Sequence, residues 1–215
     1  ISRINQICQK FLNLHVHPDL EKNFYFYGIH MQPEMSMEVW APFVSNQIFI
    51  IKTIAKALPP NTNFYVKLHP IDANSWNLKQ LKQLSKIPSV KIVSHAANSR
   101  IFIEKSEIVF TIQGTIGYEA ALLGRKVITF GENMIEDFDN VYRVQDFNSL
   151  KNLILNVSTD SYPSKEKIKE GFKKYIKRLY HGPHNNWVNN PNKYQINQFA
   201  SHLVCLINYL KKDEI

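Results

Sequence analysis

The sequence is poor in cysteine, in glycine and in long apolar runs, and each shortage excludes a class of protein. Its two cysteines, Cys8 and Cys205, lie near opposite ends of 215 residues, which argues against a disulfide framework or zinc knuckle and favours a reducing compartment. Seven glycines and ten prolines argue against a long disordered tract. No apolar run approaches the roughly 18 residues of a membrane span, and no signal peptide precedes the fold. We therefore expect a soluble cytoplasmic protein, with attachment to the inner face of the cytoplasmic membrane left open.

Acidic residues are the minority among the charged ones. The 18 Asp and Glu face 26 Lys and Arg, giving a net charge of +8 and a pI of about 9.3. Such a balance fits an anionic partner: nucleotide phosphates, an acidic glycan, an anionic membrane surface or nucleic acid. Much of the excess lies in residues 165–178, whose simpler interpretation is the solvated face of one helix. Nucleic acid is disfavoured because no basic strand face carries interleaved aromatic residues.

Between residues 24 and 144, short β-rich runs alternate with longer helical patterns. This order predicts an α/β fold, a doubly wound parallel six-stranded sheet of the Rossmann-like type with helices on both faces. Such a sheet has the strand order 3-2-1-4-5-6 and binds ligands at the carboxyl ends of its strands, where the order reverses. The expected strands are 24–29, 63–68, 90–93, 108–112, 127–130 and 141–144, and the expected helices lie near 43–58, 75–86, 99–105, 116–124, 146–157, 164–180 and 194–212.

Composition divides the chain into three parts. We expect a helical lead-in over 1–23, a Rossmann-like domain over 24–157 and a helical extension over 158–215. Ile1 is not a natural initiator, so the chain resembles an excised domain or a processed product.

The turn after the fourth expected strand suits an anion. Residues 113–117 (QGTIG) carry the chain from the strand into a helix that is expected to begin near Ile116. Glycine lets the backbone approach a ligand, and a helix N-terminus offers unpaired N–H groups and a partial positive charge. Thr115 is the expected N-cap. The candidate phosphate-binding residues of this turn are Gln113, Gly114, Thr115 and Gly117.

Glu119 follows Thr115 by four residues and should project from the same helix face. A capping box would place the acid one residue earlier, where Tyr118 stands. Local capping therefore does not explain Glu119, whereas hydrogen bonding to ribose hydroxyls would. The simpler alternative is an acid placed to suit the helix dipole.

Two further loops should reach the same edge of the sheet. His69 and Pro70 end the second strand, where the proline stops the ladder and holds His69 extended. His69 could then donate a hydrogen bond to phosphate or stabilise charge on a departing nucleotide, although a histidine before proline is often only a strand terminator. After the first strand, Gln32 and Glu34 are expected at the mouth of this cleft, in what could also be an ordinary polar loop.

Metal binding is not favoured. The pairs His15-x-His17 and His181-x-x-His184 each lack a nearby third ligand.

Together these motifs resemble a known family, the capsule polysaccharide biosynthesis proteins, which include bacterial Kdo transferases of the GT-B type. The similarity covers roughly residues 25–131. It rests on HMQPE (30–34), ALPP (57–60), VKLHP (66–70) and IVFTIQGTIGYEAALLGRKVITFG (108–131). The HP element is also similar to that of CMP-sialic acid transferases.

The resemblance implies a GT-B C-terminal domain that binds a nucleotide sugar, with a CMP-linked sugar favoured, and uses neither metal nor cofactor. It places His69 and Pro70 in the nucleotide-phosphate motif, with Gly114, Thr115 and Glu119 in the donor-site motif. A complete enzyme of this kind has a preceding domain that supplies the acceptor site for a polysaccharide or glycolipid and usually the catalytic base. Only a short segment precedes the first strand here, so we expect an incomplete glycosyltransferase and assign no base. A CDP-glycerol or CDP-ribitol phosphotransferase and a non-catalytic nucleotide-sugar-binding module remain alternatives.

Overall fold

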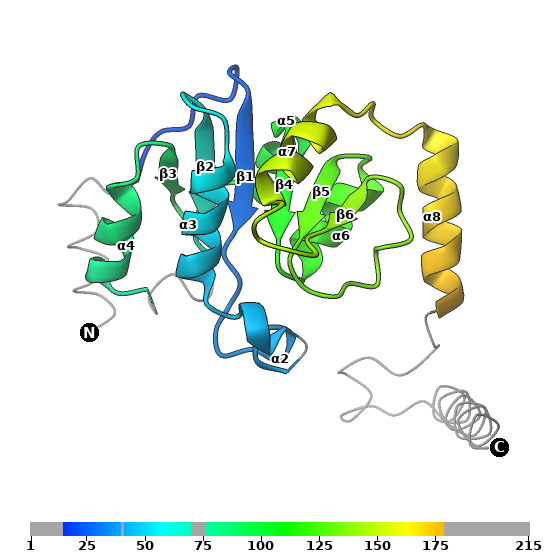
Figure 1. The fold of residues 1–215 in the computed structure, drawn as a ribbon, viewed down its shortest axis with the longest axis horizontal. Coiled ribbons are helices and arrows are strands. Elements are labelled where there is room, and N and C mark those ends of the chain that lie inside the picture. Colours follow the sequence, from blue (N-terminus) through cyan, green and yellow to red (C-terminus); the bar gives the residue numbers. More distant parts are fainter. Residues whose placement is uncertain (1–14, 40, 70–75, 179–215) are drawn as a thin grey trace. The chain divides into compact units, whose positions relative to one another are not determined.

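The computed structural model describes residues 15–39, 41–69 and 76–178 (Figure 1). Pro70, the histidine pair at 181 and 184 and the expected helix 194–212 therefore lie outside the described residues. Residues up to Phe172 belong to one compact unit, and of the second unit, from Lys173, only the last turns of one helix are described.

The core of the fold is a six-stranded sheet in which every neighbouring pair runs parallel. The strand order β3-β2-β1-β4-β5-β6 confirms the doubly wound prediction, with the order reversing between β1 and β4. All residues of β1, β4 and β5 are buried, as strands covered on both faces must be. The strands are β1 (Phe24–Gly28), β2 (Asn63–Lys67), β3 (Val90–Val93), β4 (Ile108–Thr111), β5 (Lys126–Thr129) and β6 (Val141–Arg143).

Helices cover both faces of this sheet (Figure 1). They are α2 (Met35–Glu38), the 3-10 turn η1 (Pro42–Val44), α3 (Gln47–Ala57), α4 (Leu78–Ser85), α5 (Ser99–Lys105), α6 (Thr115–Leu122), α7 (Leu150–Thr159) and α8 (Lys165–Arg178). Among the described residues, no helix is both long enough and apolar enough to cross a membrane.

The alternation of aromatic residues in β1 explains how the two helical layers attach. Phe24 and Phe26 point to one face, where both rings meet Phe102 of α5 at centroid distances of 6.0 and 5.2 Å. Tyr25 and Tyr27 point to the other face, toward α7 and α3. Since successive strand residues face opposite sides, one short run anchors both layers.

Two helix starts differ from the prediction for local reasons. The helix expected from Phe43 begins at Gln47, because the side chain of Asn46 caps it by accepting the Phe49 N–H at 3.0 Å. Phe43 lies in η1 with its side chain fully exposed, so its apolar character did not mark a buried helix face. The helix expected from residue 75 begins at Leu78, where Asn77 and Gln80 form a capping box.

Candidate functional site

A cavity of about 250 Å³ lies at the carboxyl ends of the central strands, where β1 and β4 are neighbours. This is the edge at which doubly wound sheets bind ligands. Five of the predicted site residues line it: Glu34, His69, Gln113, Gly114 and Thr115. The remaining wall comes from Ile29, His30, Met31, Ile116 and Tyr118. The structure thus brings together three loops that are separated by up to about 80 positions in the sequence.

The phosphate turn differs from the prediction in one detail. The N-cap of α6 is Gly114, with φ 97° and ψ 178°, and no side chain caps the helix. The prediction of Thr115 as N-cap was wrong, because the backbone conformation of Gly114 starts the helix at Thr115 itself. That conformation belongs to a region that is essentially restricted to glycine. The N–H groups of the first turn of α6 are therefore not consumed by a capping side chain, and they adjoin the cavity.

Close packing between β1 and α6 holds this turn against the sheet. A Cβ on Gly28, the last residue of β1, would overlap the Cδ1 atom of Ile116. Ile116 therefore fills the space that the glycine leaves, and the first turn of α6 rests on the end of β1.

This contact gives a testable prediction. Gly28→Ala should lower the free energy of unfolding by about 0.5–1.5 kcal/mol, because the half-buried Ile116 side chain must leave its rotamer to admit the new methyl group. Adding Ile116→Val removes the overlapping methyl group and should recover part of the loss, which urea unfolding of both single variants and the double variant would measure. Losses that simply add in the double variant would contradict the proposed contact.

Lys67 is a buried basic residue on the same side of the sheet as the contact between Gly28 and Ile116. It ends β2 and pairs in register with Gly28, so both residues face the same side of the sheet. Its Nζ donates only a long hydrogen bond, 3.4 Å, to the Leu68 carbonyl, and burial lowers the pKa of the amine. The sequence did not indicate that Lys67 would be buried, because a lysine in a strand usually faces solvent.

Gln113 and Gly117 hold the phosphate turn in place, Gln113 through a hydrogen bond of its side chain and Gly117 through close packing. The side-chain amide of Gln113 donates to the carbonyl of Glu132, so it ties the turn to the loop after β5. Gly117 is buried, and a Cβ there would lie 2.9 Å from the Thr111 Cγ2 atom. Glycine is needed at this position because α6 and β4 approach each other too closely for a side chain. Gly117 does not line the cavity.

Gln32 faces away from this cavity. Its amide donates to Ser45 O at 2.9 Å, and its Oε1 accepts a hydrogen bond from Gln47 Nε2 at 2.8 Å. It lines a separate hollow together with Trp76 and Gln80. The structure thus gives Gln32 a role in shaping the loop after β1, while its predicted ligand contact remains a prediction.

His69 and Glu119 occupy different surroundings. His69 is half-buried in the wall of the cavity. Glu119 is exposed on α6, one turn beyond Thr115, and is not part of the wall. A ligand that filled the cavity would reach Glu119 only if it extended outward along α6.

His30 is the wall residue that sequence reasoning missed. Its side chain is only 7% exposed, its Nε2 accepts the Ile112 N–H at 3.1 Å, and the Thr111 hydroxyl lies 3.3 Å away. Burial, and to a smaller extent the neighbouring His69, lower the pKa of the imidazole to about 4, so the ring is neutral at pH 7. Ile112, its hydrogen-bond partner, lies 82 positions away in the sequence, and no local sequence pattern indicates such a contact.

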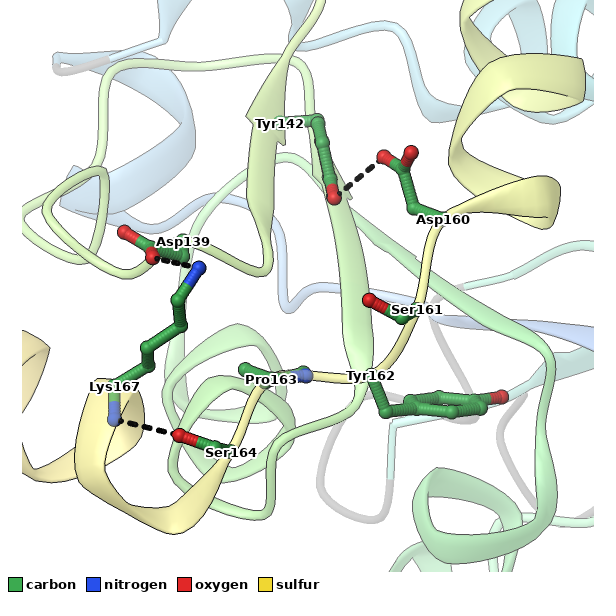
Figure 2. A pocket seen from close by; sticks show the side chains of 8 residues that line it. All are labelled: Asp139, Tyr142, Asp160, Ser161, Tyr162, Pro163, Ser164 and Lys167. Carbon is green, nitrogen blue, oxygen red and sulfur yellow. Dashed lines mark hydrogen bonds and ion pairs between the residues drawn. The ribbon is translucent and has the colours of Figure 1, made fainter.

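A second hollow lies at the opposite, amino-terminal edge of the sheet, around the segment between α7 and α8 (Figure 2). Two pairs of its polar side chains already interact with each other. The Tyr142 hydroxyl donates to Asp160 Oδ2 at 2.8 Å, and Lys167 forms an ion pair with Asp139 at 3.2 Å. Two carboxylates against one lysine do not favour an anion here, and doubly wound sheets bind ligands at the other edge, so we do not assign the ligand to this hollow.

Within residues 15–39, 41–69 and 76–178, no three His, Cys, Asp or Glu side chains are grouped closely enough to hold a metal ion. The groups that line the carboxyl-edge cavity are instead hydrogen-bond donors, one carboxylate and apolar side chains, a set that suits an organic anion.

Comparison with known proteins gives one family. The family model described as "Capsule polysaccharide biosynthesis protein" matches residues 13–136, more than half of the chain. Protein FixF of Sinorhizobium fredii is 28% identical over 134 residues, which cover 61% of this chain and 32% of FixF.

Two solved structures share the fold. The β-Kdo 2,7-transferase KpsC of Thermosulfurimonas dismutans matches with a TM-score of 0.50 and 15% identity, over 80% of this chain and 53% of its own. HepE of Anabaena, solved in complex with UDP-glucose, matches with a TM-score of 0.51 and 16% identity, over 80% of this chain and 47% of its own. The chain thus spans about a third of FixF and about half of these two proteins.

Proposed function

The chain belongs to the capsule polysaccharide biosynthesis protein family, and we propose that it is the donor-binding domain of a bacterial glycosyltransferase of the GT-B type that makes a capsule or another surface polysaccharide. The observation that carries this proposal is the carboxyl-edge cavity, where the uncapped start of α6 meets His69 and Glu34. The ligand is a nucleotide sugar, with a CMP-linked sugar favoured, and its phosphate lies against the Gly114–Thr115 turn. The acceptor is a polysaccharide or a glycolipid.

The chemistry of the wall supports this assignment. A phosphate gains from helix N–H groups and from the positive end of the α6 dipole. Lys67, buried on the same side of the sheet, would add a favourable field when its amine is protonated. A carboxylate such as Glu34 accepts hydrogen bonds from sugar or ribose hydroxyls. During transfer, His69 would stabilise negative charge on the departing nucleotide by donating a hydrogen bond to it.

The size of the cavity bears on what else the reaction needs. Complete small-molecule sites occupy roughly 300–1,000 Å³, whereas this cavity measures about 250 Å³. We propose that it holds the phosphate-bearing part of the donor. The acceptor site and the catalytic base would then come from another part of the whole protein, consistent with relatives of which this chain matches only about a third to a half.

The proposal predicts that His69→Ala weakens CMP binding about tenfold, because a hydrogen bond to a charged group contributes roughly 1.5–3 kcal/mol. Glu119→Ala should weaken it less, about threefold, since an exposed carboxylate competes with water for the ribose hydroxyls. Isothermal titration calorimetry of the 215-residue chain measures both.

His17→Ala is the matched control for these variants, because His17 is exposed and lies far from the cavity wall. It should bind CMP as tightly as the unmodified chain. Unchanged affinity in both His69→Ala and Glu119→Ala would count against the donor-site assignment.

A further inference from the structure

His30 has a hydrogen-bonding pattern that fixes the position of its proton. Nε2 accepts the backbone N–H of Ile112 at 3.1 Å, so this nitrogen carries no hydrogen. The nearby Thr111 hydroxyl donates its own hydrogen to the Gln113 carbonyl at 2.7 Å. A neutral imidazole with an unprotonated Nε2 must carry its proton on Nδ1.

The protonated nitrogen faces the phosphate turn. Nδ1 lies 3.3 Å from the point that a Cβ on Gly114 would occupy. Gly114 has no side chain that could cover this N–H, and His30 and Gly114 both line the cavity. The hydrogen bonds of the His30 ring within the described part of the chain all involve Nε2, so Nδ1–H retains its capacity for a ligand.

The ring cannot easily turn away from this direction. The backbone of His30 is held on both sides by Gln47, whose Oε1 accepts the His30 N–H at 2.8 Å and whose Nε2 donates to the His30 carbonyl at 2.9 Å. The imidazole also meets the ring of Tyr27 edge-on, at a centroid distance of 6.0 Å. A donor that is already oriented loses little conformational entropy when it binds.

We propose that the Nδ1–H of His30 donates a hydrogen bond to a phosphate oxygen of the bound nucleotide. This inference rests on the proposed function and adds a phosphate-binding residue to it. Phosphate oxygens accept hydrogen bonds but donate none, and they would sit between His30, the first turn of α6 and His69. Because the His30 ring is neutral, it contributes an oriented N–H group, while the partial positive charge comes from the N-terminal end of α6.

Two amide substitutions separate this role from a structural one. In His30→Gln the side-chain amide reaches the position of Nε2, so it can still accept the Ile112 N–H but loses the donor near Gly114. In His30→Asn the shorter amide reaches the position of Nδ1, so it keeps a donor toward the cavity and leaves the Ile112 N–H without an acceptor. A ligand role and a structural role therefore predict opposite rankings.

We expect His30→Gln to unfold near the urea concentration of the unmodified protein and to bind CMP at least tenfold more weakly. His30→Asn should be less stable but bind CMP within about threefold of the unmodified protein, measured by calorimetry at a temperature where it is folded. Cytidine, which lacks phosphate, should bind both variants as it binds the unmodified protein. The reverse ranking, with His30→Asn losing CMP and His30→Gln keeping it, would overturn the inference.

Nuclear magnetic resonance of ¹⁵N-histidine-labelled protein gives a readout that folding alone does not move. The free protein should show His30 as the Nδ1–H tautomer, and CMP should shift that proton downfield. A His30 signal that CMP leaves unchanged would also overturn the inference. Chain that binds none of CMP, CDP, UDP and GDP would overturn the proposed function together with it, whereas CMP binding unaffected by His30→Gln would overturn this inference alone.

Discussion

Replacing Gln47 with leucine should lower the free energy of unfolding by about 3–5 kcal/mol, because buried hydrogen-bonding groups left without partners cost about 1–3 kcal/mol each. Gln47 is 2% exposed at the first position of α3. Its Oε1 accepts from the Tyr27 hydroxyl and the His30 N–H at 3.0 and 2.8 Å. Its Nε2 donates to the His30 carbonyl and to Gln32 Oε1 at 2.9 and 2.8 Å. Leucine has a similar volume but cannot form any of these four hydrogen bonds.

Urea unfolding monitored by circular dichroism measures this loss. Gln83→Leu is the matched control, since Gln83 is exposed on α4 and should change stability by less than about 0.5 kcal/mol. The Gln47 variant should also lose nucleotide affinity, because the His30 backbone is no longer held against the cavity. If Gln47→Leu were as stable as Gln83→Leu, the loop after β1 would not depend on the Gln47 amide.

Gly114→Ala should be the most damaging single change to ligand binding. The φ of 97° and ψ of 178° at this residue fall in a region that L-residues occupy only at a cost of about 1–3 kcal/mol. The added Cβ would also come within 3.3 Å of the His30 Nδ1 atom. The turn should relax to a different conformation, so the N–H groups at the start of α6 would no longer point into the cavity. We expect CMP affinity to fall at least thirtyfold, or about 2 kcal/mol.

Asn61→Ala is a useful control for this strain. Asn61 also has a positive φ, 60°, but lies exposed in the turn before β2, away from the cavity. Alanine there should cost about 1 kcal/mol of stability and leave CMP binding unchanged. Calorimetry on both variants distinguishes local strain from loss of the site. Undiminished CMP binding by Gly114→Ala would mean that the phosphate does not rest on this turn.

The strand order and the position of the cavity could be predicted because they follow from repeating features of the sequence. Buried parallel strands read as continuous apolar runs, and the alternation with helices fixes the order of a doubly wound sheet. The run 108–112 (IVFTI) followed by a glycine turn was enough to place β4 and the start of α6 within one residue. Three loops at the same edge could then be expected to meet.

The particular side chains that form the wall were harder to predict. His30 and Gln47 act through contacts with residues 82 and 17 positions away, and such contacts leave no periodic signal. Gln32 was expected at the mouth of the cleft, and its hydrogen bond with the amide of Gln47 could not be foreseen from the sequence, while its ligand contact remains a prediction. Thr115 has the residue type that favours an N-cap, yet the backbone of Gly114 starts the helix one position early. In these cases contacts between residues distant in the sequence, or the backbone conformation, set the local structure, and residue preferences alone did not predict it.

The most direct test of the central claim is isothermal titration calorimetry of the chain with CMP, CDP, UDP and GDP. The account predicts saturable binding of at least one nucleotide, with CMP favoured, at one site per chain. Gly114→Ala should weaken CMP binding at least thirtyfold, while Asn61→Ala should leave it unchanged. If no nucleotide bound, or if Gly114→Ala bound as well as the unmodified chain, the carboxyl-edge cavity would not be a nucleotide-sugar site.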